Sequence, residues 1–107
     1  MLTLPIKKKW FDMILSEKKK EEYREIKPYY TTRFKNIHLL SYNELPELWT
    51  EEIVFKNGYS SSSPSFTGVV RLTVGTGKPE WGAEPGKEYY VLKIIEIKNI
   101  NTKGALK

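Results

Sequence analysis

Two segments with the composition of β-strands dominate the second half of this 107-residue chain. Residues 66–74 and 88–98 are rich in Val, Ile, Thr and Tyr, which suit a pleated, half-buried surface. Between them, residues 75–86 hold four glycines and two prolines, a composition typical of a loop. The chain is therefore expected to fold around a β-sheet.

The first quarter of the chain alternates between strand and helix patterns. Residues 2–6 predict a short strand. Four apolar side chains within residues 10–15 fall on one face of a helix that begins near Lys8. Residues 18–26 alternate and predict an unusually charged strand, which Pro28 ends because proline has no N–H for the ladder.

The remaining segments predict shorter elements. We expect a strand over 37–42 that carries His38, a short helix within 43–52, extended structure over 52–55, a mobile loop over 57–64 and fraying of 99–107.

Five or six short strands with one or two short helices predict the α+β class. In a chain of this length they favour a small, strongly bent, mostly antiparallel sheet or a partly closed barrel. The length also favours a single domain over residues 1–107.

Composition excludes several kinds of site. Because the chain has no cysteine, disulfides, thiol nucleophiles and thiolate zinc sites are excluded. His38 is the only histidine, so no histidine-rich metal site or histidine relay can form within one chain. We expect no metal and no cofactor.

The order of charged and apolar residues also bears on location. The short apolar start precedes Lys7, Lys8 and Lys9, the reverse of a secretion signal, and no apolar run is long enough to span a bilayer. We expect a soluble, cytoplasmic protein without membrane contact, as a monomer.

The net charge of +5 lies entirely at the N-terminal end. Residues 1–35 hold ten basic and five acidic side chains, whereas residues 36–107 hold eight of each. This asymmetry predicts a surface for a polyanion such as a nucleic acid. The alternative is an ordinary solvated helix flank.

The junction between the predicted helix and the charged strand is the most unusual segment. Residues 15–25 place charges on both faces of the strand, and an unpaired buried charge costs several kcal/mol. Either the charges line a cleft, or this is an edge strand in which Lys and Glu pair on the surface.

Three charges in this junction match a known spacing. Lys19, Glu22 and Arg24 resemble the Gly-x-Lys-x-x-Glu-x-Arg signature of ASCH domains, which are relatives of PUA-type RNA-binding domains. Glu17 stands where the signature has glycine. A glycine suits a left-handed helix cap there, and a glutamate in that conformation would be strained by about 1–2 kcal/mol.

The resemblance extends over most of the chain. Residues 4–7, 10–11, 23–30, 57–66 and 79–90 are similar to small stand-alone ASCH proteins of bacteria and phages. The resemblance implies a PUA-like β-barrel with a cleft beside the first helix. In that cleft the motif lysine, glutamate and arginine would point at RNA, single-stranded nucleic acid or a nucleotide.

The chemistry of these side chains fits such a ligand. Lys19 and Arg24 can meet phosphates, while Glu22 holds both and can accept from a base amino group. Tyr23 and Tyr30 offer faces for base stacking, or else pack in the core. Lys9 adds positive charge from the basic segment.

Trp81 lies between Gly77 and Gly82 in the loop that joins the two long strands. Two interpretations remain open. The indole swings over a bound base on a flexible loop, or it plugs one end of the barrel.

Hydrolysis is the alternative function. Some ASCH proteins resemble amidohydrolases that act on acylated cytidine, but their threonine is replaced here by Glu22. A ribonuclease could use Lys19 and Glu22 as an acid–base pair if burial shifted their pKa values. A protein-interaction module would instead use the surface around Trp49 and Tyr59.

Overall fold

The computed structural model describes residues 1–39 and 49–102, which form an α+β protein. The described part contains five strands, two α-helices and one short 3₁₀ helix. In chain order they are β1 (Thr3–Pro5), α1 (Lys8–Leu15), β2 (Glu21–Arg24), α2 (Pro28–Asn36), β3 (Glu51–Lys56), β4 (Ser65–Thr76), the 3₁₀ helix (Pro79–Trp81) and β5 (Glu88–Asn101).

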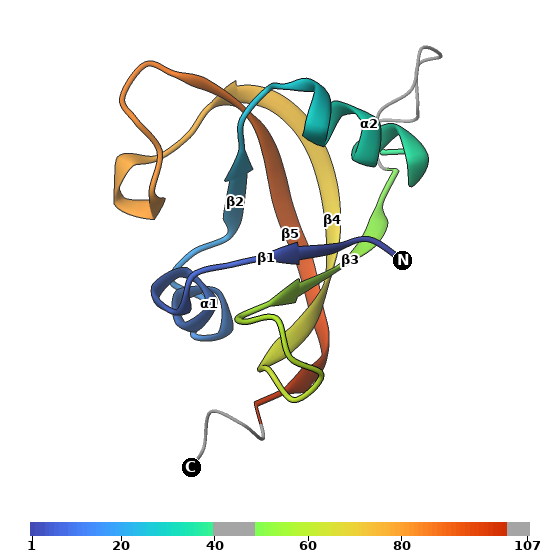
Figure 1. Cartoon of the computed structure of the whole chain (residues 1–107). Coiled ribbons are helices and arrows are strands. Elements are labelled where there is room, and N and C mark those ends of the chain that lie inside the picture. Colours follow the sequence, from blue (N-terminus) through green and yellow to red (C-terminus); the bar gives the residue numbers. More distant parts are fainter. Residues whose placement is uncertain (40–48, 103–107) are drawn as a thin grey trace.

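The strands form one mixed sheet in the order β1-β3-β4-β5-β2. β1 runs parallel to β3, and the other three pairs are antiparallel. Figure 1 shows the long, curved strands β4 and β5 side by side through the middle of the molecule. Within the described residues, β1 and β2 are the two edges and do not pair with each other, so the sheet is open there and the expected barrel is not confirmed.

The core lies between this sheet and the two helices. α1 forms as predicted, with Phe11 and Ile14 buried and Trp10 partly buried at the margin of the core. A second, smaller cluster consists of Tyr23, Ala83, Tyr89 and Val91, with Trp81 packed against it. The smaller cluster joins β2 and β5 to the loop that contains the 3₁₀ helix.

The helix α2 was not predicted from the sequence. Pro28 does follow the charged strand, but it also occupies the first turn of α2, where its missing N–H costs nothing. Phe34 is the only residue of α2 that is buried. With so little apolar periodicity, the helix is not recognisable from hydrophobic pattern.

The strand expected over 37–42 is wrong for residues 37–39. These residues turn out of α2: His38 has φ of 64°, and the Leu39 N–H donates to the Phe34 carbonyl at 2.9 Å. Residues 40–42 and most of the helix expected within 43–52 lie outside the described residues.

Two of the other predictions for the second half of the chain are confirmed, and one is wrong in part. Extended structure over 52–55 and the loop over 57–64 are confirmed. Fraying is wrong for residues 99–101, because they continue β5 and Asn101 pairs with Ser65. None of the described helices is long and apolar enough to cross a membrane.

Candidate functional site

The C-terminal end of α1 has a left-handed turn at Glu17, where φ is 63°. The Glu17 N–H donates to the Ile14 carbonyl at 3.0 Å, and the Lys18 N–H donates to the Met13 carbonyl at 2.9 Å. This pair of bonds is the Schellman motif, which usually has glycine at the left-handed position. The glutamate therefore adopts the strained cap conformation, and the chain then turns toward β2.

Lys19 follows this turn and is completely buried, with 0% of its side chain exposed. Its Nζ lies 3.1 Å from Glu22 Oε1 and also donates to the Trp81 carbonyl. The rings of Trp10 and Tyr23 lie 4.8 and 4.9 Å from the same Nζ. Burial lowers the pKa of Lys19, although the charge of Glu22 opposes that shift.

Arg24 binds the other oxygen of Glu22. Its Nη1 donates to Glu22 Oε2 at 2.7 Å and to the Tyr23 carbonyl at 2.8 Å, while Nη2 donates to the Pro5 carbonyl at 2.6 Å. These bonds use three of the five guanidinium N–H groups. Among the described residues, the other two have no hydrogen-bond partner, so they are available to a ligand.

Lys19, Glu22 and Arg24 lie at one end of a pocket of about 260 Å³, which we call the ion-pair pocket. Six residues singled out from the sequence belong to this region: five line the pocket, whereas the sixth, Lys19, binds Glu22 but does not line it. The lining residues are Pro5, Ile6, Lys7, Trp10, Glu22, Tyr23, Arg24, Tyr30, Trp81 and Gly82.

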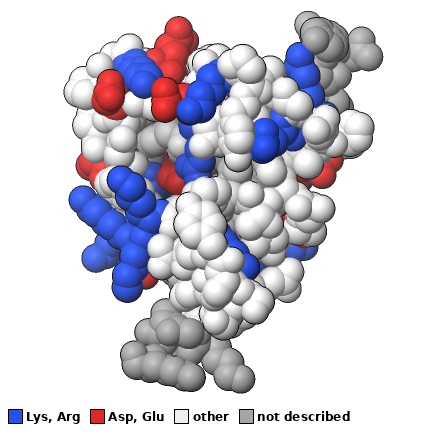
Figure 2. Space-filling view, viewed as in Figure 1, with Lys and Arg blue, Asp and Glu red and all other residues white. Residues whose placement is uncertain are grey.

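Lys9 is the one predicted ligand-binding residue outside this group. Its Nζ lies 4.6 Å from the Trp10 ring, but the residue does not line the pocket. Figure 2 shows basic side chains gathered over α1, where Lys7, Lys8 and Lys9 are all exposed. Lys9 therefore adds to the positive charge beside the pocket without forming its wall.

Lys7 and Trp10 line the pocket but were not among the predicted ligand-binding residues. The sequence placed Lys7 in a basic run, Trp10 on the apolar face of α1, and both within the segments that resemble ASCH proteins. The incomplete burial of Trp10 follows from its place at the margin of that face, so the helical pattern did contain a signal. Charge alone did not distinguish Lys7 from Lys8 or Lys9.

Trp81 belongs to an anchored turn. A Cβ on Gly82, whose φ is 103°, would lie 2.9 Å from a ring atom of Trp10, and one on Gly77 would lie 2.7 Å from Tyr23. The glycines thus permit close packing of the turn against two aromatic rings. The bond from Lys19 to the Trp81 carbonyl also holds the backbone of this turn, and the Trp81 side chain packs against the cluster of Tyr23, Ala83, Tyr89 and Val91.

Tyr23 is held by contacts within the protein. Its hydroxyl donates to Glu21 Oε1 at 2.8 Å and accepts from the Lys78 N–H at 3.0 Å, and its ring packs 5.7 Å from that of Tyr89. Burial raises the pKa of Tyr23. Tyr23 therefore supports the pocket, whereas Tyr30, Trp10 and Trp81 are the aromatic residues open to a ligand.

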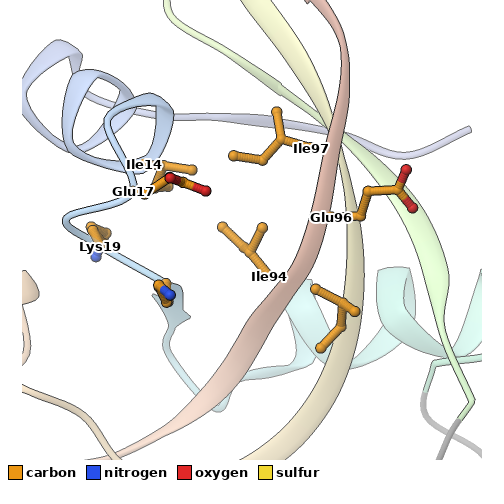
Figure 3. A pocket seen from close by; sticks show the side chains of 8 residues that line it. Ile14, Glu17, Lys19, Ile94, Glu96 and Ile97 are labelled. Carbon is orange, nitrogen blue, oxygen red and sulfur yellow. The ribbon is translucent and has the colours of Figure 1, made fainter.

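A larger cavity lies at the other side of the α1 terminus. This helix-end groove has a volume of about 340 Å³ and is lined by Ile14, Glu17, Lys19, Lys20, Ile94, Ile95, Glu96 and Ile97. Figure 3 shows that its walls are the end of α1 and the strand β5, with isoleucines between them. The ammonium of Lys19, which also lines this groove, is already bound to Glu22 and to the Trp81 carbonyl.

No family model, no curated protein and no solved structure matched this chain in our comparisons. Among residues 1–39 and 49–102, no three histidine, aspartate or glutamate side chains gather in a way that could hold a metal ion. The chemistry of the site therefore has to be argued from its own residues.

Proposed function

We propose that the ion-pair pocket binds RNA or a nucleotide through a phosphate and an aromatic base. Charge is the first support. Among the lining residues, Lys7 and Arg24 are cationic and Glu22 is the only carboxylate, and the buried Lys19 that binds Glu22 brings the net charge of these four side chains to +2. Such a site favours an anion, and a guanidinium with two unused donors suits phosphate oxygens.

The aromatic lining is the second support. Trp10, Tyr30 and Trp81 surround the same pocket, and each is only partly buried. Stacking on such rings contributes about 1–3 kcal/mol per base. The observation that carries the proposal is this combination: a buried Lys19–Glu22–Arg24 network that borders an aromatic-walled pocket.

Binding is favoured over hydrolysis by the state of Lys19 and Glu22. The Lys19 side chain has no exposed surface, and each carboxylate oxygen of Glu22 already accepts from a cation. General acid–base catalysis needs a group within hydrogen-bond reach of the reacting atom. We therefore assign Lys19 and Glu22 the role of positioning Arg24 and Trp81, and leave hydrolysis by this pair as the alternative.

The proposed relationship to ASCH domains and to the PUA-like fold rests on the same residues. The motif lysine, glutamate and arginine form one connected network beside α1, as the resemblance implies. Glu17 adopts the left-handed conformation that the motif glycine would favour. An experimental structure that shows whether the sheet is closed would test the PUA-like assignment.

Direct binding measurements test the proposal. Adenosine 5′-monophosphate (AMP) and single-stranded oligoadenylate are titrated into the protein at several salt concentrations. If four to six phosphates are neutralised, log affinity for the oligonucleotide should fall against log salt with a slope of about −3 to −4. Trp81→Ala should weaken both ligands about 5- to 150-fold, whereas Ile95→Ala in the helix-end groove should change neither.

Two results would count against the proposal. One is no binding of either ligand at low salt, and the other is equal effects of the two alanine variants. Incubation of labelled RNA with the protein separates binding from the alternative, since a binding module leaves the RNA intact. Cleavage that is lost in Glu22→Gln would favour hydrolysis instead.

A further inference from the structure

A second hollow adjoins the ion-pair pocket. This Tyr59 pocket has a volume of about 460 Å³ and is lined by Pro5, Ile6, Lys7, Asn57, Gly58 and Tyr59. Residues 5–7 also line the ion-pair pocket, so one segment of the chain borders both hollows. In Figure 1 this segment leaves β1 and leads to α1, between the turn that carries Trp81 and the loop that follows β3.

The shared segment is held from both sides. On the side of the ion-pair pocket, Arg24 Nη2 donates to the Pro5 carbonyl at a distance of 2.6 Å. On the side of the Tyr59 pocket, Asn57 Nδ2 donates to the Ile6 carbonyl at a distance of 2.9 Å. The Ile6 N–H donates to the Lys56 carbonyl at 3.0 Å. Since these backbone groups are already paired, the exposed ammonium of Lys7 is the polar group that both hollows offer to a ligand.

Tyr59 is an unusual residue for a surface loop. It is 92% exposed, and no hydrogen bond or ring contact to its side chain occurs among the described residues. Its loop is nevertheless internally bonded: the Asn57 N–H donates to the Pro64 carbonyl at 2.9 Å, and the hydroxyl of Ser60 lies 3.2 Å from that of Ser63. The phenol is thus presented to solvent by a bonded turn, with its ring free for stacking.

We propose that the ligand spans both hollows and is a single-stranded oligonucleotide rather than a mononucleotide. One nucleotide occupies the ion-pair pocket, the phosphate that joins it to its neighbour binds Lys7, and the neighbouring base stacks on Tyr59. This inference rests on the proposed function. A peptide ligand fits less well, because extended peptides bind through free main-chain groups, and those of the shared segment are already used.

A comparison of ligands of increasing length tests this inference. AMP and the single-stranded tetranucleotide of adenylate are titrated into wild type, Tyr59→Ala and Tyr59→Phe. Tyr59→Ala should weaken the tetranucleotide about 5- to 150-fold and leave AMP unchanged, and Tyr59→Phe should bind both ligands like wild type. Because Tyr59 is so exposed, urea denaturation should give the same stability for all three proteins.

Lys7→Gln supplies an independent measurement. It should weaken the tetranucleotide and lower the steepness of its salt dependence by about 0.7, the amount expected for one phosphate of a single strand. Lys98→Gln is the matched control, since it removes one charge from β5 outside both hollows and should change neither quantity.

The outcomes separate the two proposals. If Trp81→Ala weakens AMP and the tetranucleotide while Tyr59→Ala changes neither, the ion-pair pocket binds nucleotides and the second base site is wrong. If Tyr59→Ala weakens AMP as strongly as the tetranucleotide, the assignment of separate bases to the two hollows is also wrong. If wild type binds neither ligand, the proposed function fails and this inference fails with it.

Discussion

The ion-pair pocket and the helix-end groove flank the same turn at the end of α1, yet they offer a ligand very different surroundings. The groove is the larger, at about 340 against 260 Å³. Of its charged residues, Glu17, Lys20 and Glu96 are exposed, whereas Lys19 is buried and bound to Glu22. The smaller pocket borders a buried network in which each oxygen of Glu22 binds a cation.

This difference shows that volume alone does not identify the better candidate site. Exposed charges on long side chains must be ordered when a ligand binds, and that ordering opposes binding. In the ion-pair pocket the ordering is part of the fold, because Glu22 already fixes the Arg24 side chain that lines the pocket and also binds the buried Lys19. The pocket can therefore bind an anion without further loss of side-chain entropy at these positions.

Removal of the shared carboxylate should have the largest effect. Glu22→Gln leaves the ammonium of Lys19 buried without its counter-charge, which should lower the free energy of unfolding by about 3–5 kcal/mol at neutral pH. Glu96→Gln makes the same exchange in the helix-end groove and should change the free energy of unfolding by less than about 0.5 kcal/mol. Urea denaturation of both variants measures the two values, and similar losses would remove the distinction between the two sites.

Exchange of the fixed guanidinium should weaken ligand binding next. Arg24→Lys keeps the charge but cannot bond to Glu22, Pro5 and a phosphate at once, so affinity for AMP should fall by about 1.5–3 kcal/mol. Lys20→Arg is the reverse exchange in the helix-end groove. Calorimetric titration should find that Lys20→Arg binds AMP with unchanged affinity. A loss of affinity as large as that of Arg24→Lys would place the ligand in the helix-end groove.

The pH dependence of stability sharpens the comparison through Lys19. The pKa of Lys19 in the folded protein lies below the usual 10.5. Between the lowered pKa and pH 10.5, the unfolded chain therefore binds more protons than the folded one. Stability from this group should therefore rise with pH toward 10.5, by at most about 1.4 kcal/mol per pH unit.

Lys19→Met should lack this rise, whereas Lys20→Met, which removes an exposed lysine, should keep it. Denaturation between about pH 7 and 9 measures the difference, because tyrosine ionisation contributes only as the pH approaches about 10. Parallel curves for wild type and Lys19→Met would mean that the folded protein leaves the Lys19 pKa unshifted.

The smallest effect concerns the groove residue Glu17. Because its φ of 63° suits glycine, Glu17→Gly should raise the free energy of unfolding by about 0.5–1 kcal/mol. Ser16→Gly, next to it at φ of −86°, should lower stability instead. Neither variant should change AMP affinity, and a loss of affinity in Glu17→Gly would show that the glutamate side chain takes part in binding.

The sequence predicted best those elements whose structure is decided by a local pattern of residues. The apolar spacing from Trp10 to Leu15 predicted α1, because the backbone sets the helical period, and enrichment in Val, Ile, Thr and Tyr predicted β4 and β5. Missing periodicity explains why α2 was overlooked, since only Phe34 is buried there. His38 was placed on a strand because its left-handed turn has no glycine to mark it.

The sequence by itself placed Lys19, Glu22 and Arg24 within six residues of one another, but an extended segment could also scatter these side chains along an edge strand. The sequence could not decide which of them faces solvent. Burial of Lys19 requires the carbonyl of Trp81, which lies 62 residues away, together with the ring of Trp10 from α1. Only the tertiary structure brings these groups around one ammonium, because packing between distant segments decides whether a long side chain is exposed or enclosed.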